Sequence, residues 1–128
     1  MQHPKTQRDL ADLVDNSQKT EIRAGYTHRF ITLMFVTVGE RVFCRRYSYG
    51  EPSWHSVFQT HPAGQVRLDK TVVKIEARVP QDLDEIVRHV DQAYADALKK
   101  LGASYMLAGA TEPRARESTM EVSLANLV

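Results

Sequence analysis

The sequence predicts a mainly β domain: a six-stranded antiparallel barrel flanked by one long α-helix and one or two short α-helices. Six segments show the period or the apolar richness of strands, and two others repeat apolar residues at helical steps of three and four. The order of elements brings successive antiparallel strands side by side, with helices outside. We expect one domain over residues 1–128, with the barrel over about residues 18–125 and a helix within residues 1–17.

The first elements are a helix over residues 7–15 and a strand over residues 20–26. Thr6 is a suitable N-cap, and the apolar residues of the helix share one face. In the strand, apolar residues alternate with Glu21 and Arg23, which is typical of a half-buried strand.

Residues 30–38 are apolar on both faces, so we expect a strand that lies between the core and a second covered surface, either a helix or a second subunit. This pattern predicts a homodimer, and light scattering that showed a monomer would contradict it. Gly39 and Glu40 then suit a two-residue hairpin turn into a strand over residues 42–48.

The pattern of residues 52–79 predicts a short helix followed by a hairpin. The helix begins at Pro52, because proline is favoured in a first helical turn, and continues to Pro62. Strands over residues 65–68 and 71–79 follow, joined at residues 69–70.

The long helix spans residues 82–101, with apolar residues in one stripe. Asp82 and Glu85 have the spacing of a capping box, and Gly102 suits a left-handed stop. Residues 113–117 are predicted as an exposed loop, before a last strand over residues 118–124.

The composition indicates a protein without a polyanionic partner. Lys and Arg number 17 against 16 Asp and Glu, so the formal charge is +1, which argues against nucleic acid or an anionic membrane as partner. The apolar run at residues 30–38 is far shorter than a membrane span, and the first residues do not have the pattern of a signal peptide. With a lone cysteine, Cys44, we expect a cytoplasmic protein without disulfides.

Residues 45–55 contain the densest group of polar and aromatic side chains. Arginines offer forked donors to phosphate, a serine adds a hydroxyl, and a tryptophan offers a flat stacking face. Arg45, Arg46, Ser48 and Trp54 are therefore candidates for binding a phosphorylated, planar ligand. The alternative is that one arginine faces solvent while the aromatic residues pack on the barrel.

Other chemistry has less support from the sequence. His28, His55 and His61 do not have the spacing of metal ligands, so we predict no metal site. Cys44 lies within a predicted strand, where a buried and unreactive thiol is expected. The catalytic residues, if the chain has any, stay unassigned.

Several segments together resemble a known family. They are the Thr-Glu-Ile-Arg strand, the apolar strand at 30–38, the hairpin end at 45–50 that leads to Trp54, the long helix before Leu101-Gly102, and the closing Ser-Thr-Met-Glu-Val-Ser-Leu strand. Over about residues 18–125 this pattern resembles an uncharacterised bacterial family allied to the FMN-binding split barrels, such as the pyridoxamine-phosphate oxidases and the deazaflavin-dependent nitroreductases.

The resemblance implies a split barrel, a homodimer with sites at the subunit interface, and FMN or a deazaflavin as cofactor. Carried over to this chain, Arg45, Arg46 and Ser48 would meet the cofactor phosphate, while Trp54 and His55 would line the pocket mouth. Relatives with a working cofactor site tend to follow the tryptophan with an aromatic residue and then Arg or Asn, whereas His55 follows here. A barrel that has kept the fold but has lost or changed the ligand is therefore also an alternative.

Two hypotheses of function follow from the resemblance. The first is an oxidoreductase in which bound FMN or a deazaflavin passes a hydride. The second is a non-catalytic, dimeric module that binds a small molecule and keeps the fold without the flavin site.

Overall fold

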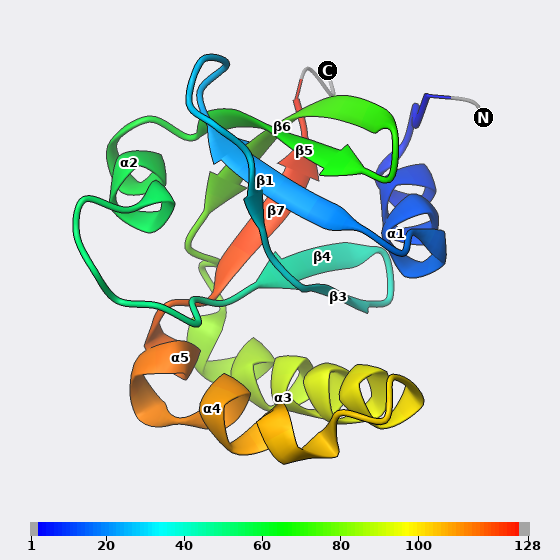
Figure 1. The fold of residues 1–128 in the computed structure, drawn as a ribbon, viewed down its shortest axis with the longest axis vertical. Coiled ribbons are helices and arrows are strands. Elements are labelled where there is room, and N and C mark those ends of the chain that lie inside the picture. The colour runs from blue at the N-terminus through cyan, green and yellow to red at the C-terminus, as the bar shows by residue number, and fades with distance from the viewer. Residues whose placement is uncertain (1–2, 126–128) are drawn as a thin grey trace.

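The computed structural model describes residues 3–125, which form seven strands and five α-helices (Figure 1). The strands are β1 (Thr20–Ala24), β2 (Ile31–Thr32), β3 (Phe35–Val38), β4 (Arg41–Cys44), β5 (Ala63–Leu68), β6 (Thr71–Arg78) and β7 (Met120–Leu124). The helices are α1 (Gln7–Asn16), α2 (Trp54–Thr60), α3 (Leu83–Lys100), α4 (Leu107–Thr111) and α5 (Pro113–Glu117), with a 3₁₀ turn, η1, at Ser104–Met106. The prediction of a mainly β fold with flanking helices is confirmed.

The strands form one curled antiparallel sheet of seven strands, a half-barrel in the order β2-β1-β5-β6-β7-β4-β3, so the prediction of a six-stranded barrel is wrong. The predicted strand at residues 30–38 is divided, because β2 pairs with β1 whereas β3 pairs with β4. Between them, the Leu33 N–H donates to the Thr20 carbonyl at 3.1 Å, and the Leu33 carbonyl accepts from the Thr20 hydroxyl at 2.6 Å. These bonds hold the crossing segment against the start of β1 and place the two halves of the predicted strand at opposite edges of the sheet.

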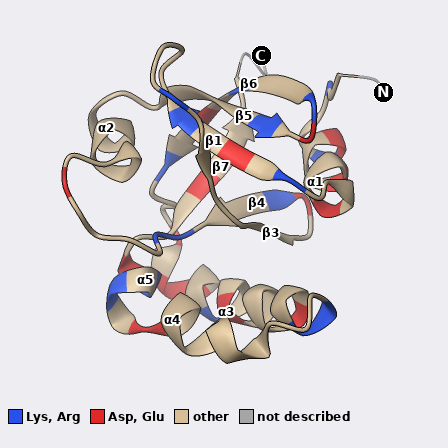
Figure 2. Cartoon of the chain, in the orientation of Figure 1, with Lys and Arg blue, Asp and Glu red and all other residues tan. Residues whose placement is uncertain are grey.

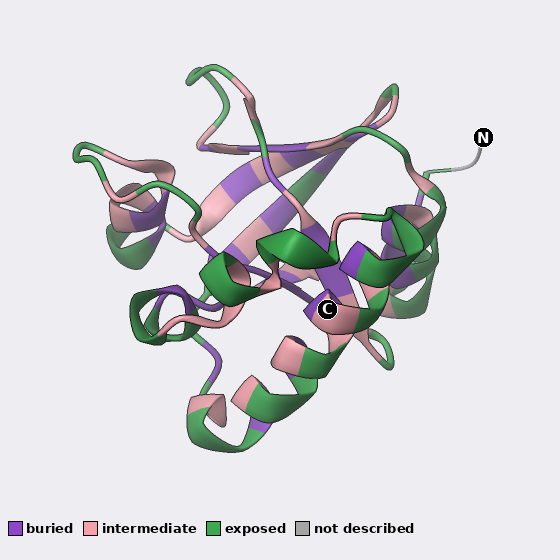
Figure 3. Ribbon diagram, turned by 60° about the horizontal axis from the view of Figure 1, so that its bottom comes forward, coloured by how far each residue is buried: buried purple, intermediate pink, exposed green. Residues whose placement is uncertain are grey.

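Two apolar cores lie on opposite faces of the sheet. The larger core joins the sheet to α1 and α2, and the smaller core joins β3 and β4 to α3. Phe35 packs in the larger core and Val36 in the smaller one. Helix α3 therefore covers the second apolar face of this segment, which accounts for the sequence pattern without a second subunit, and the homodimer stays a prediction. Helices α1, α2 and α3 each contain both buried and exposed residues (Figure 3).

Several local signals act as the sequence predicts. The Thr6 hydroxyl accepts from the Asp9 N–H at 3.1 Å and the Asp9 carboxylate accepts from the Thr6 N–H at 3.2 Å, which completes a capping box on α1. Gly39, in the two-residue turn between β3 and β4, has φ +62°, and Gly102, which follows the end of α3, has φ +68°. Glycine adopts this left-handed conformation without the steric cost that other residues meet.

Two helices differ from the prediction. Helix α2 begins after Ser53 and not at Pro52, because the Ser53 hydroxyl accepts from the Ser56 N–H at 3.2 Å and so caps the helix. Residues 113–117 form α5 and not a loop, with a proline in the first turn, where its missing N–H costs nothing.

Two other boundaries are set by arginine side chains. Asp82 precedes α3 as predicted, but its carboxylate accepts two bonds from Arg41, each at 2.8 Å, and forms no capping box with Glu85. Strand β4 ends at Cys44 and not at residue 48. The side chain of the next residue, Arg45, forms hydrogen bonds with α3 and α4. Cys44 is fully buried as expected, and burial raises the pKa of its thiol.

Candidate functional site

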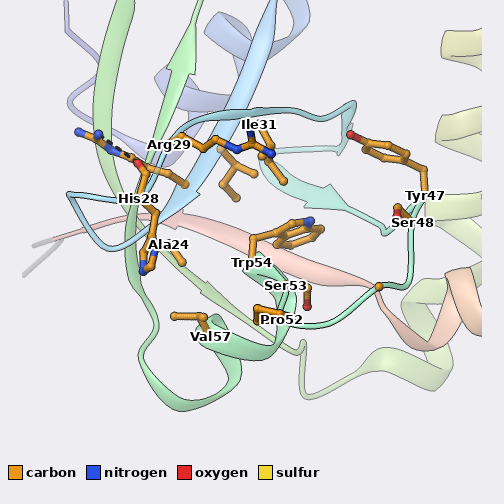
Figure 4. Close-up of a pocket in the computed structure, with 13 residues that line it drawn as sticks. Ala24, His28, Arg29, Ile31, Tyr47, Ser48, Pro52, Ser53, Trp54 and Val57 are labelled. Carbon is orange, nitrogen blue, oxygen red and sulfur yellow. Dashed lines mark hydrogen bonds between the residues drawn. The ribbon is translucent and has the colours of Figure 1, made fainter.

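Two cavities lie on either side of the segment that joins β4 to α2. The first, which we call the Trp54 cavity, has a volume of 410 Å³ and lies between β1, the loop from β1 to β2, and the start of α2 (Figure 4). The second, which we call the Tyr105 cavity, has a volume of 760 Å³ and lies between the residue 32–34 crossing, α3, η1 and α4. Both volumes are within the range of small-molecule sites.

The structure divides the predicted site residues between these cavities. Ser48 and Trp54 line the Trp54 cavity, while Arg45 and Arg46 line the Tyr105 cavity. His55 lines neither. The five residues therefore do not form a single site.

Arg45 is held by the protein itself. Its side chain is 1% exposed and donates to Asp91 Oδ1 at 2.6 Å, to Thr119 Oγ1 at 2.9 Å and to the Ala110 carbonyl at 2.9 Å, with a longer bond of 3.3 Å to the Val87 carbonyl. These contacts tie the end of β4 to α3, α4 and the start of β7. Four of the five N–H donors of this guanidinium therefore have partners before any ligand is added.

Arg46 is also engaged within its own loop. Its guanidinium donates to the Ser48 carbonyl at 3.0 Å and to the Gly50 carbonyl at 3.2 Å, and it pairs with Glu51 at 3.0 Å. It also lies over the Tyr49 ring, 5.1 Å from the centroid. These contacts shape the loop that leads to α2.

His55 does not line the Trp54 cavity but packs against the Trp54 ring. It is buried, and its Nε2 lies 3.0 Å from the Ser118 carbonyl, an acceptor that requires hydrogen on that nitrogen. Burial lowers the pKa of His55. Trp54 contacts the rings of His55 and Phe58 edge-to-face, with centroids 5.6 Å and 6.3 Å apart, so its position in the cavity is set by packing.

The residues that sequence reasoning missed come mainly from the loop between β1 and β2. His28 and Arg29 line the Trp54 cavity together with Tyr47, and in Figure 4 Arg29 reaches into the cavity on the side where Trp54 lies. Tyr47 belongs to the polar and aromatic segment that the sequence singled out, but His28 and Arg29 lie far from it in the chain, and no sequence motif marks them.

Arg29 differs from the other arginine of this cavity in its partners. Arg23 donates to the Gln65 side-chain oxygen and to the His28 carbonyl, and it lies 4.4 Å from the Phe30 ring centroid. Arg29 is exposed, and within residues 3–125 its guanidinium has no hydrogen bond or ion pair. A charged donor set is therefore available in the Trp54 cavity at Arg29.

Two kinds of feature are absent from the described part of the chain. Among residues 3–125 no group of three or more His, Cys, Asp or Glu side chains is arranged to hold a metal ion. Over the same residues, no helix has both the length and the apolar character needed to cross a membrane.

Comparison with known families matches residues 8–122, from α1 into β7, to uncharacterised proteins conserved in bacteria, DUF2255. The chain belongs to the DUF2255 family. No curated protein matches the chain. Membership of DUF2255 confirms the resemblance to an uncharacterised bacterial family, while the alliance with the FMN-binding split barrels stays a prediction.

Proposed function

We propose that this chain is a small-molecule-binding module whose ligand is a planar anion held in the Trp54 cavity. The observation that carries the proposal is the pairing of an unengaged guanidinium, Arg29, with an aromatic ring in one cavity of 410 Å³.

The charge of the ligand follows from Arg29. An arginine binds carboxylate or phosphate with two parallel hydrogen bonds, and its attraction for an anion is stronger in a partly enclosed site than in water. The hydroxyl groups of Tyr47 and Ser48 have no hydrogen-bond partner within residues 3–125, so they add donors at the same cavity. No carboxylate side chain lines this cavity, and the Glu51 carboxylate, which accepts from the Ser53 hydroxyl at 3.1 Å, is paired with Arg46.

The shape of the ligand follows from Trp54. Its ring is held edge-to-face by His55 and Phe58, which leaves the indole to offer a flat surface to the cavity. Flat aromatic ligands stack on such a surface with offset geometry. A planar ring that carries a phosphate or carboxylate therefore matches both sides of the site.

FMN and phosphorylated deazaflavins belong to this chemical class, and a flavin-dependent oxidoreductase is the second candidate function. Trp54 and Ser48 would meet the ring and the phosphate as the resemblance implies, with Arg29 in the place expected for Arg45 and Arg46. A bound flavin would supply hydride chemistry, and the residues of the chain would orient it. The binding module is the better supported of the two, because the two arginines expected at the phosphate are engaged elsewhere.

The test compares FMN with riboflavin, which has the same ring without the phosphate. Trp54 is the only tryptophan of the chain, so quenching of its fluorescence reports directly on this cavity. We expect FMN to bind about tenfold or more tightly than riboflavin, and Arg29→Gln to abolish that difference, since one charge-assisted bond contributes about 1.5–3 kcal/mol. The control is Arg88→Gln, which removes an exposed arginine of α3 that lines neither cavity.

Equal affinities for FMN and riboflavin, or the same loss in both variants, would refute the role of Arg29. An absence of quenching by FMN, riboflavin, adenosine monophosphate and benzoate would refute the binding module itself. For the second candidate, reduced nicotinamide nucleotides should bleach the absorption of bound FMN, and a bound flavin that stays oxidised with every reductant would rule out the oxidoreductase.

A further inference from the structure

The Tyr105 cavity is the larger of the two cavities and has a different chemical character. Its walls come from the residue 32–34 crossing, the loop after β4, α3, η1 and α4. Helix α4 and η1 contain no charged residue, and Figure 2 shows them without Lys, Arg, Asp or Glu colours. Its lining also includes two methionines, Met34 and Met106, whose flexible side chains adapt to different ligand shapes.

The cations of this cavity are all engaged within the protein. Arg45 and Arg46 have the partners described above, and Arg114 pairs with Glu112 at 2.9 Å and stacks 4.0 Å from the Tyr49 ring centroid. In the Trp54 cavity, by contrast, Arg29 is unengaged. Each guanidinium of the Tyr105 cavity is therefore already paired with a carboxylate, and Glu112 has its arginine.

Large side chains are exposed at the mouth of this cavity. Tyr105 is 85% exposed, Tyr47 69% and Met106 53%. Neighbouring exposed apolar side chains mark ligand or partner sites more often than ordinary surface. The hydroxyls of Tyr47 and Tyr105 have no hydrogen-bond partner within residues 3–125, whereas the Tyr94 hydroxyl, deeper in the cavity, donates to the Met34 carbonyl at 3.2 Å.

We propose that the Tyr105 cavity is a second binding site, which takes a neutral aromatic molecule. Apolar and aromatic walls favour burial of an aromatic ring, and the Tyr105 hydroxyl donates to a neutral acceptor on it. A charged group on the ligand would lose its hydration without gaining an unengaged partner of opposite charge. Tyr47 lines both cavities, so the two ligands would lie on opposite sides of one side chain.

The experiment uses two fluorescent probes with one scaffold. N-phenyl-1-naphthylamine is neutral, and 1-anilino-8-naphthalenesulfonate is the same scaffold with a sulfonate. Gly109→Phe adds a ring at the wall of the cavity, because Gly109 lines it, and the Cβ itself meets no heavy atom within 4 Å. Ala108→Phe, at an exposed position of α4 outside the cavity lining, is the matched control.

We expect saturable binding of the neutral probe, weaker by about tenfold or more in Gly109→Phe and unchanged in Ala108→Phe. No saturable binding, equal loss in both variants, or binding of the sulfonated probe as tight as that of the neutral one would overturn the proposal. Arg29→Gln should leave the neutral probe bound, and Gly109→Phe should leave FMN quenching of Trp54 unchanged. A result that refutes the site in the Tyr105 cavity can thus be distinguished from one that refutes the site in the Trp54 cavity.

Discussion

Replacement of Arg45 by glutamine separates a structural role from a ligand-binding role. The change removes the donors that reach Thr119, Asp91 and the carbonyls of Ala110 and Val87. These partners lie on α3, on α4 and just before β7, and Arg45 is the only buried arginine within residues 3–125. Arg45→Gln should therefore loosen the contact between the sheet and the helices α3 and α4.

The expected cost can be worked from these contacts. Loss of one partner of a buried ion pair costs about 3–5 kcal/mol, mainly because the other charge stays buried. Here Asp91 keeps a second partner, since Arg116 lies 2.8 Å from its other carboxylate oxygen. The Asp91 side chain is also 19% exposed, so water can reach it. The free energy of unfolding should therefore fall by about 3 kcal/mol, the lower end of that range. The Ala110 carbonyl, in the last turn of α4, contributes about 1–3 kcal/mol of this before water replaces its donor.

The assay is urea unfolding followed by Trp54 fluorescence. With a urea dependence of about 1–3 kcal/mol per molar, the midpoint should fall by about 1–3 M. Arg8→Gln is the control, because the side chains of Arg8 and its partner Glu40 are 61% and 55% exposed, and such a pair contributes about 0–1 kcal/mol. FMN affinity should be unchanged in Arg45→Gln measured below its unfolding midpoint.

The reasoning would be refuted if Arg45→Gln unfolded at the urea concentration of the natural chain and lost FMN binding. That result would instead support a direct contact between Arg45 and the cofactor phosphate, as the resemblance implies.

Two further predictions concern the core and pH. Gly64→Ala should lower the free energy of unfolding by about 1–3 kcal/mol, because the added Cβ would lie 2.5 Å from the Arg23 carbonyl oxygen and 2.6 Å from the Phe58 ring. His55 should make the fold less stable as pH falls below its ordinary pKa of 6.5: burial lowers the folded pKa, so the unfolded chain takes up the proton first. Urea unfolding at a series of pH values from about 7 to about 5 measures this loss, which His55→Asn should reduce.

Each of these predictions has a matched result that would contradict it. Gly50→Ala is the control for the core, since a Cβ at Gly50 meets no heavy atom within 4 Å, and equal stability of both variants would contradict the steric argument. An unfolding midpoint that rose as pH fell through the same interval would contradict the sign given for His55.

Local physical chemistry in the sequence was sufficient to predict most elements. The helical stripe and end signals predicted α3, Thr6 and Asp9 form the expected cap of α1, and Gly39 takes the expected turn conformation. These features depend on residues within one or two turns of one another, so a linear pattern contains them.

The sequence alone could not divide the segment at residues 30–38 or separate the candidate site residues. Apolar residues on both faces indicate burial on both sides, but they do not show which strand each half pairs with, and Leu33 reaches its hydrogen-bond partner only in the folded sheet. The same limit applies to the site: Arg29 and Trp54 lie in one cavity although they are far apart in the chain.

The sequence by itself determined a mainly β chain with flanking helices, a near-neutral charge, and an aromatic and basic segment after β4. Only the tertiary structure decided which arginines are engaged. Arg45 and Arg29 have the same side chain, but Arg45 is surrounded by a carboxylate, a hydroxyl and two helix carbonyls, while Arg29 faces a cavity. Whether a guanidinium can bind a ligand depends on partners from distant elements, and these are brought together only when the chain folds.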